Sequence, residues 1–277
     1  MPELPEVEAA RRELVPAMQG ARFECVILHR PDLRTKFPRR FKARLEGSTV
    51  TELARRAKYL LAHLSSGETL LMHLGMSGSF RVEHADAAHS PGADDAGRHD
   101  HVVFDMSSQA TVFFNDPRRF GFMDLVPAGR LDTHPTLSLL GPEPLAPDFD
   151  GAALAAACRG RKISLKVALM DQRVVAGLGN IYVSEALHVA RLSPHRQAST
   201  IATPTGAPRD SAHRLAAAIK KVLEDAIART TGDIYRASRF RVYDREGERC
   251  GQRACAGSIR RQTQAGRSTF YCVRCQR

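Results

Sequence analysis

The sequence predicts an α+β fold in three parts: an antiparallel β-sandwich or barrel behind a leading helix, a helical middle, and a C-terminal hairpin built around cysteines. Residues 21–126 read as short segments in which apolar and polar residues alternate and turns intervene, as in antiparallel strands. Residues 151–230 carry helical patterns instead, and four of the six cysteines fall in the last 28 residues. These observations together give the fold class.

Local signals define the expected elements. A helix is expected from Pro5 to about Met18, because proline and acidic residues suit the first turn and Gly20 suits the stop. The Pro- and Gly-rich stretch 140–151 reads as an interdomain linker. Strands are expected within residues 21–30, 48–56, 58–64, 69–75, 78–83, 101–106, 110–115 and 120–126, and helices within residues 151–160, 164–172, 180–192 and 210–230.

The charge indicates a polyanionic partner, with nucleic acid as the first candidate. The chain of 277 residues has 41 Lys and Arg against 30 Asp and Glu, a net charge of +11. From Arg229 onward there are 12 arginines and four acidic residues, so the excess is concentrated at one end. Because no secretory signal or membrane-spanning run is present, a cytoplasmic protein is expected, with cysteines that do not form disulfides.

The clustered cysteines predict a metal site. Cys250, Cys255, Cys272 and Cys275 follow the pattern C-x4-C-x16-C-x2-C, two close pairs separated by a hairpin-length spacer. This spacing fits one tetrahedral zinc ion held by four thiolates. Such a zinc ion is structural, because four thiolates leave no open coordination position. It would also supply the folding energy that so short a segment lacks.

Three further stretches each have two interpretations. The glycine-rich turn before Asn180 opens a helix, where backbone amides can bind a phosphate, or it is an ordinary helix–helix turn. The stretch FNDPRRFGFMD places Arg118 and Phe120 at a strand turn, either as a plain hairpin tip or as a probe of a base stack. Lys58 lies in a strand of apolar neighbours, where most lysines extend to solvent.

Taken together, these stretches resemble the formamidopyrimidine-DNA glycosylase family. The matching motifs are MPELPEVE, RRAKYLL, HLGMSGS, HDH, DPRRFG, LGPEPL, LMDQRVVAGLGNIYVSEAL, VYDREG and GRSTFYCVRCQR, in the family's order over nearly the whole chain. The resemblance implies an N-terminal β-sandwich with its leading helix, a helix-two-turn-helix domain and a zinc-finger hairpin. The corresponding ranges are 1–130, 151–238 and 239–277, with a linker at 131–150.

The resemblance also implies a bifunctional DNA glycosylase and AP lyase of base-excision repair that removes oxidised purines. Once Met1 is removed, the amine of Pro2 would be the nucleophile, with Glu3 as the neighbouring acid. An α-amine has a lower reference pKa than a lysine side chain, so it is more often neutral at pH 7. Lys58 matches the residue assigned to β-elimination, and Arg267 matches the residue linked to δ-elimination and phosphate binding.

Other residues match DNA-contact positions of the family. His73, His99, Arg161 and Asn180 match contacts to DNA. The trio that fills the gap left by the flipped nucleotide corresponds to Met76, Arg118 and Phe120, with Arg118 facing the orphaned cytosine. The implied partner is double-stranded DNA with an oxidised base, bound by a monomer that associates with the nucleoid.

Two alternatives and three departures accompany the resemblance. The endonuclease VIII branch, which prefers oxidised pyrimidines, begins MPEGPE, whereas Leu4 follows Glu3 here. A non-catalytic DNA-binding relative would lack one of the catalytic residues, and all are present. The first cysteine pair has four intervening residues where the family commonly has two, and the family more often has lysine at Arg161. The stretch 230–247, which would close over the flipped base, is compressed.

Overall fold

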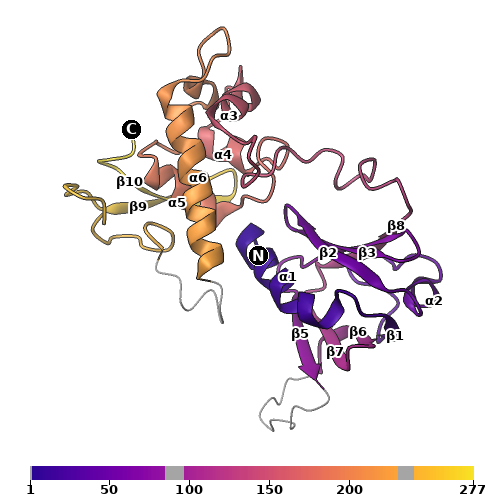
Figure 1. The fold of residues 1–277 in the computed structure, drawn as a ribbon. Helices are drawn as coiled ribbons and strands as arrows, with labels where there is room; N and C mark the ends of the chain where they lie inside the picture. Colours follow the sequence, from indigo (N-terminus) through magenta and orange to yellow (C-terminus); the bar gives the residue numbers. More distant parts are fainter. Residues whose placement is uncertain (1, 85–96, 230–239) are drawn as a thin grey trace. The chain divides into compact units, whose positions relative to one another are not determined.

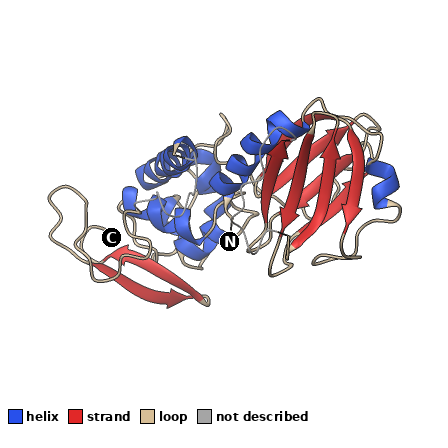
Figure 2. Cartoon of the chain, turned by 90° about the horizontal axis from the view of Figure 1, so that it is seen from below, coloured by secondary structure: helices blue, strands red, loops and turns tan. Residues whose placement is uncertain are grey.

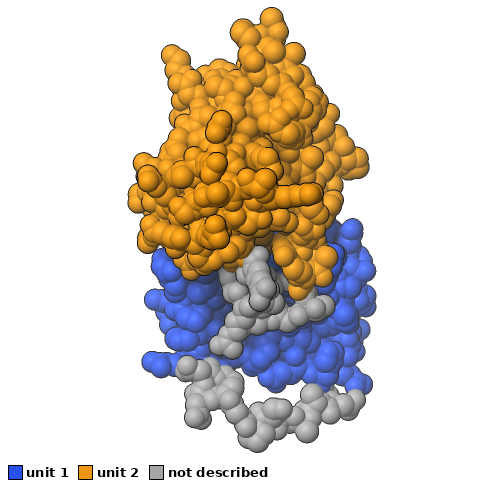
Figure 3. Space-filling view, turned by 90° about the vertical axis from the view of Figure 1, so that its left-hand side faces the viewer, with its two compact units in different colours: residues 1–138 blue, residues 139–277 orange. Residues whose placement is uncertain are grey.

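The computed structural model describes residues 2–84, 97–229 and 240–277 (Figure 1). The chain divides into two compact units, Met1–Ser138 and Leu139–Arg277, coloured separately in Figure 3. The division lies just before the Pro- and Gly-rich stretch 140–151 and within the range 131–150 that the resemblance implies. The finer boundaries at residues 130, 150 and 238 stay predictions, and residue 238 lies outside the described residues.

Unit 1 contains two four-stranded antiparallel sheets, visible as two layers in Figure 2. The sequence left a sandwich and a barrel open, and the separate sheets make it a sandwich. One sheet has the order β1 (Phe23–Leu28), β6 (Asp100–Met106), β7 (Ala110–Asn115), β5 (Ser79–His84). The other has the order β2 (Val50–Arg56), β3 (Tyr59–Leu64), β4 (Thr69–His73), β8 (Phe122–Val126). All eight expected strands are confirmed.

The core of unit 1 joins both sheets to the leading helix α1 (Leu4–Met18). Every second residue of β7 is buried, which is the pattern of a strand with one face on a core. Phe23 and Phe104 are fully buried, with ring centroids 5.2 Å apart in an edge-to-face arrangement. Leu14 of α1 belongs to the same cluster. Each such side chain contributes about 1.5–3 kcal/mol by burial, so α1 is fixed to the sandwich.

Unit 2 combines helices with a C-terminal hairpin. Its helices are α3 (Gly151–Cys158), α4 (Leu165–Met170), α5 (Asn180–Val189), the 3-10 helix η1 (Ala198–Ile201) and α6 (Asp210–Ala228). Helix α6 buries one apolar stripe, including Leu215, Ile219 and Leu223, and packs against α3 and α5. The hairpin consists of β9 (Ile259–Gln264) and β10 (Arg267–Cys272). None of the described helices is long and apolar enough to cross a membrane.

The structure corrects the sequence interpretation at three places. Lys58 does not lie in a strand: the register pairs Arg56 with Tyr59, so Ala57 and Lys58 form the two-residue turn between β2 and β3. Ala57 adopts a φ of 53°, which a sequence pattern does not reveal for alanine. The short helix α2 (Phe41–Leu45) and η1 were not expected, because five and four residues are too few to show a helical period.

Candidate functional site

The N-terminal candidates lie at the start of α1. Pro2 precedes the helix and is half-buried, and Glu3 is its N-cap residue with a side chain only 3% exposed. Glu3 and Glu6 form a capping box, in which the backbone N–H of Glu3 donates to Glu6 Oε2 at 2.8 Å. Pro5 stands in the first turn, as expected. Helix capping therefore holds the Glu3 carboxyl group directly after Pro2.

A partly buried ion-pair network ties α1 to the turn that carries Lys58. The Glu8 carboxylate accepts hydrogen bonds from Arg11 at 2.9 Å, Arg12 at 3.0 Å and Arg55 at 3.3 Å. Burial raises the pKa of Glu8, but these guanidinium groups hold it below its usual value. Arg55 also donates to the carbonyl oxygen of Ala57 at 3.0 Å. One carboxylate thus links the leading helix to the β2–β3 turn.

Lys58 and His73 share a neighbourhood in unit 1. Lys58 is 8% exposed, so the expectation of a lysine reaching out to solvent does not hold. Burial, followed by the positive charges of Lys58 and Arg34, lowers the pKa of His73 to about 4. His73 Nδ1 accepts from the backbone N–H of Gly75 at 3.1 Å. The imidazole is therefore neutral at pH 7, and its Nε2–H is the available donor.

Two turns of the sandwich are locked together beneath the candidate void-filling residues. The buried Asp116 carboxylate accepts from the Ser77 hydroxyl at 2.6 Å and from the backbone N–H of Gly121 at 2.7 Å. Ser77 Oγ in turn accepts from the backbone N–H of Arg118 at 3.1 Å. A Cβ on Gly75 would lie 2.3 Å from the backbone nitrogen of Gly121, so the turns approach as closely as glycine allows.

The side chains above these turns are exposed. Met76 and Phe120 are each 41% exposed, so both apolar side chains are available for contact with a partner. The Arg118 guanidinium lies 4.9 Å from the centroid of the Phe120 ring. His99 joins the same region, because its carbonyl oxygen accepts from the backbone N–H of Asp116 at 3.0 Å. A rigid turn thus presents a cation and an apolar wedge side by side.

In unit 2, one predicted candidate, Asn180, and one new candidate, Lys166, both contact Ser268 of β10. Asn180, the first residue of α5, donates from Nδ2 to the Ser268 carbonyl oxygen at 2.9 Å. The same carbonyl accepts from Lys166 Nζ at 2.9 Å. Burial, with the positive charge of Arg267, lowers the pKa of Lys166 to about 8. Asn180 Oδ1 is buried and accepts no hydrogen bond from the described residues.

Arg161 lies elsewhere in unit 2, just after α3. Its Nε donates to the carbonyl oxygen of Ala157 at 2.8 Å, and its Nη1 lies 3.4 Å from Asp171 Oδ2. Arg173 binds the same carboxylate at 2.9 Å. One acidic residue therefore orients two arginines, and the guanidinium of Arg161 remains partly exposed.

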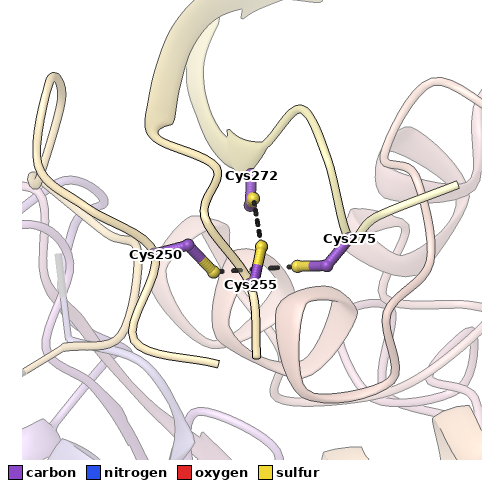
Figure 4. Close-up of side chains that lie close together, drawn as sticks. All are labelled: Cys250, Cys255, Cys272 and Cys275. Atoms are coloured by element: carbon purple, nitrogen blue, oxygen red, sulfur yellow. Dashed lines mark hydrogen bonds between the residues drawn. The ribbon is translucent and has the colours of Figure 1, made fainter. Parts of the chain in front are cut away.

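The four clustered cysteines have the geometry of a metal centre (Figure 4). All four sulfur atoms lie within 4.8 Å of one another. Cys250 and Cys275 are 3.7 Å apart at Sγ, and Cys255 and Cys272 are 3.6 Å apart. A tetrahedral zinc ion with bonds of about 2.3 Å sets sulfur atoms about 3.8 Å apart, so the residues fit the ion. All six cysteines of the chain are free.

The buried polar residues that the sequence analysis missed include three that support the candidate site. Asp116 supports the Arg118 turn, Lys166 contacts β10, and Glu185 accepts three backbone N–H groups between Arg241 and Tyr243 at 2.7–2.9 Å. A signal existed for Glu185, which is a carboxylate inside the apolar helix NIYVSEALHV. Lys166 likewise interrupts the apolar segment LKVALM. A buried charged group is costly without a hydrogen-bond partner, so a charged residue inside an apolar helix indicates a specific contact with another part of the chain.

Comparison with known proteins matches both units. Residues 1–123 match the model described as the formamidopyrimidine-DNA glycosylase N-terminal domain, and residues 140–237 match the formamidopyrimidine-DNA glycosylase H2TH domain. A formamidopyrimidine-DNA glycosylase of Bradyrhizobium diazoefficiens is 55% identical over 293 positions, with 100% of both chains covered. One of Nitrobacter winogradskyi is 56% identical over 292 positions, again with full coverage.

Solved structures show the same fold. The Lactococcus lactis formamidopyrimidine-DNA glycosylase bound non-covalently to AP-site DNA superimposes with a TM-score of 0.84 at 30% identity, covering 100% of both chains. MutM in complex with DNA containing carbocyclic 8-oxo-G gives a TM-score of 0.83 at 31% identity, also with full coverage. Sequence, domain models and fold agree, and the chain belongs to the formamidopyrimidine-DNA glycosylase family.

Proposed function

We propose that this protein is a base-excision repair glycosylase that removes oxidised purines from double-stranded DNA and then cleaves the strand as an AP lyase. The observation that carries the proposal is the buried Glu3 carboxyl group, held by a capping box directly after Pro2. An acid fixed next to an N-terminal secondary amine is the arrangement that base displacement and Schiff-base formation require. The relatives named as formamidopyrimidine-DNA glycosylases match over their full length, which supports the same assignment.

The chemistry follows from these groups. The Pro2 nitrogen lone pair attacks C1′ of the damaged nucleotide, and the C1′–N bond breaks with its electrons leaving on the base. Glu3 donates a proton to the opening sugar ring oxygen. The nitrogen loses its proton, and its lone pair then forms a C1′=N double bond as the C1′–O4′ bond breaks, with the ring oxygen taking the proton from Glu3. The resulting iminium ion has no N–H to lose, so it withdraws electrons from C1′ and makes the C2′ protons acidic. A base then removes a C2′ proton, and the 3′ C–O bond breaks in β-elimination.

Lys58 and Arg267 serve the elimination steps and the flanking phosphates in this proposal. Lys58 is buried beside His73, and the ion-pair network of Glu8 fixes its turn relative to α1. Arg267 is exposed at the start of β10. It assists the second, δ-elimination, which breaks the 5′ C–O bond.

The remaining candidates hold the DNA. Met76, Arg118 and Phe120 fill the gap left by the flipped nucleotide, supported by their exposure on two braced turns. Arg118 donates to the orphaned cytosine. Phosphates are bound by His73 through Nε2–H, by His99, by Arg161 and by Asn180, whose side-chain amide is held by its Nδ2 contact to the Ser268 carbonyl oxygen.

We also propose that the four cysteines bind one structural zinc ion. When bound, zinc supplies the folding energy of the finger, whose own apolar cluster is small. Burial raises the pKa of the Cys272 thiol, but backbone N–H groups of Cys275 and Arg274 lower it to about 7. Burial and the neighbouring sulfur atoms raise the pKa of Cys250 and Cys275 instead, so all four would be thiolates only with a cation bound. The proposal includes no role for zinc in the chemical steps.

The test of the proposal is a block of the N-terminal amine. A variant with one extra residue before Pro2 should lose base excision and borohydride trapping on DNA, because the nucleophile becomes an amide. DNA affinity should stay within about twofold of the free-terminus protein, which serves as control. Full excision by the blocked protein would disprove the role of Pro2 and would mean that another group is the nucleophile.

A lesion panel separates this proposal from the endonuclease VIII-like alternative. Duplexes carrying formamidopyrimidine, 8-oxoguanine or an oxidised pyrimidine opposite cytosine or adenine are compared in single-turnover excision. Faster removal of the purine lesions opposite cytosine supports the proposal, and faster removal of the pyrimidine lesion contradicts it. The short stretch 230–247 predicts slower excision of 8-oxoguanine than of formamidopyrimidine, although residues 230–239 lie outside the described residues. Each missing hydrogen bond to the base would cost about 1 kcal/mol.

A further inference from the structure

A buried histidine contacts the cysteine cluster without belonging to it. His188 lies in the last turn of α5 and is 1% exposed. Its Nε2 is 3.3 Å from Cys250 Sγ, while Nδ1 is buried with no partner among the described residues. Neither the cysteine pattern nor the proposed chemistry gives this imidazole a role. A buried polar ring with a single contact indicates that the contact itself matters.

The direction of this hydrogen bond follows from the state of the sulfur. A cysteine that binds a metal is a thiolate, which has no proton and can only accept. The proton of the contact must therefore be on His188 Nε2, whichever charge the ring carries. His188 is not a fifth ligand, because the four sulfur atoms already fit a complete tetrahedron. It acts on the ligand rather than on the metal.

The backbone of the same residue holds the loop between the first two cysteines. Gln252, which lies between Cys250 and Cys255, donates from Nε2 to the His188 carbonyl oxygen at 3.0 Å. One turn earlier, Glu185 accepts the backbone N–H groups of Arg241, Val242 and Tyr243, which precede the cluster. Helix α5 is therefore the platform on which the metal-binding loop rests. Within this helix, His188 is the residue whose side chain contacts a candidate metal ligand, Cys250.

We propose that His188 is a positioning residue that stabilises the metal–thiolate centre by donating an N–H···S hydrogen bond to Cys250. Four thiolates around a divalent ion leave a net negative charge, and a donated hydrogen bond spreads part of it onto the imidazole. This lowers the tendency of Cys250 to take up a proton or an electrophile and leave the metal. The proposal rests on the proposed zinc site.

The experiment compares His188→Phe with His188→Gln in the full chain. Phenylalanine keeps a ring of similar volume but donates nothing, whereas glutamine places an amide N–H near the position of Nε2. Zinc transfer to a chromogenic chelator in large excess should be about 10-fold faster in the Phe variant, the ratio that corresponds to a hydrogen bond of about 1.4 kcal/mol. The Gln variant should recover most of the wild-type rate.

A second readout separates the hydrogen bond from packing. In cobalt-substituted protein, the sulfur-to-cobalt charge-transfer band should shift in His188→Phe, because the donor no longer withdraws charge from one thiolate. Gln252→Ala is the matched control: it removes the contact to the His188 carbonyl group but keeps the N–H···S bond. Its band should stay at the wild-type position.

The outcomes distinguish this proposal from the metal site itself. Equal release rates and equal band positions in wild type and His188→Phe would overturn the role of His188 while leaving the zinc site intact. Wild-type protein without bound metal would overturn both. If His188→Phe does not retain metal, the Gln variant decides the question. Zinc release at a near-wild-type rate from His188→Gln supports the proposal. Loss of the metal from His188→Gln as well contradicts it.

Discussion

The two units hold their exposed functional candidates by different means. In unit 1, Met76 and Phe120 stand on turns whose backbones interlock at Gly75 and are bound by the Asp116 carboxylate. Those turns continue strands of an eight-stranded sandwich with a large apolar core. The geometry of this site is therefore part of the main fold and does not need a ligand.

In unit 2, the hairpin that carries Arg267 has little core of its own. Its apolar cluster contains five buried residues, and two of them are the candidate metal ligands Cys250 and Cys272. Polar side chains from α4 and α5 provide further contacts, including Lys166 at β10 and Glu185 before the cluster. With the roles proposed above, one chain would present DNA-binding groups both on a rigid fold and on a hairpin whose folding depends on a metal. The following predictions test this difference.

Removal of the metal should have the largest effect and should act on one unit. Cys272→Ser should abolish zinc binding and unfold the hairpin, because metal binding supplies about 10–16 kcal/mol in small zinc modules. Metal analysis and hydrogen exchange measure both effects. The matched control is Cys25→Ser, a half-exposed cysteine outside the cluster. If the sandwich also lost amide protection, unit 1 would depend on the metal too. The proposed difference between the two units would then be wrong.

Gly75→Ala should disturb the turns of unit 1. Gly75 has a φ of +63° and an added Cβ would lie 2.3 Å from the backbone of Gly121, so the substitution adds a clash to backbone strain. We expect a loss of about 2–4 kcal/mol in the free energy of unfolding, measured by urea denaturation. Gly129→Ala is the control, with a φ of +69° and open space, and should cost about 1 kcal/mol. Equal losses would show that the close approach is unimportant.

The strands of unit 1 and the cysteine cluster of unit 2 could be predicted from the sequence. The long-range contacts that hold each site in place could not. Alternation identified all eight strands and the cysteine spacing identified the cluster, because both depend on repeated local patterns. The brace at Asp116 and the contact of His188 with Cys250 could not be predicted, because their partners are 39 and 62 residues away in the chain. The turn position of Lys58 was also missed, since alanine rarely adopts the positive φ found at Ala57.

Acid should destabilise unit 1 through His73. Its folded pKa of about 4 lies below the unfolded value of about 6.5, so between these values only the unfolded chain binds the proton. Stability is therefore unaffected above pH 6.5 and falls as pH decreases from 6.5 to 4, by about 1–3 kcal/mol. His73→Phe should remove this part of the dependence in urea denaturation measured from pH 4 to 7. Parallel profiles for variant and wild type would contradict the assignment.

The smallest predicted effect concerns the salt dependence of DNA binding. It tests whether the charge of Arg267 itself contacts a phosphate. Arg267 is exposed next to the turn of Ala265 and Gly266 at the tip of the hairpin. If its guanidinium neutralises one phosphate, Arg267→Gln should make the log–log slope of affinity against salt less negative by about 0.9. Arg22→Gln removes the same charge from the exposed pair with Glu24 in unit 1, and should leave the slope unchanged.

The position of Arg267 makes this test specific to the metal-dependent attachment. Lys166, whose pKa is lowered partly by Arg267, is buried against β10 and cannot take over the contact without leaving Ser268 and Thr269. The slope change should therefore appear in zinc-loaded protein and disappear after zinc is removed, because the hairpin no longer presents the arginine. An Arg267→Gln slope equal to wild type in the zinc-loaded protein would exclude the phosphate contact. A slope change that persists without zinc would show that the hairpin keeps its geometry without the metal, and the contrast between the two units would fail.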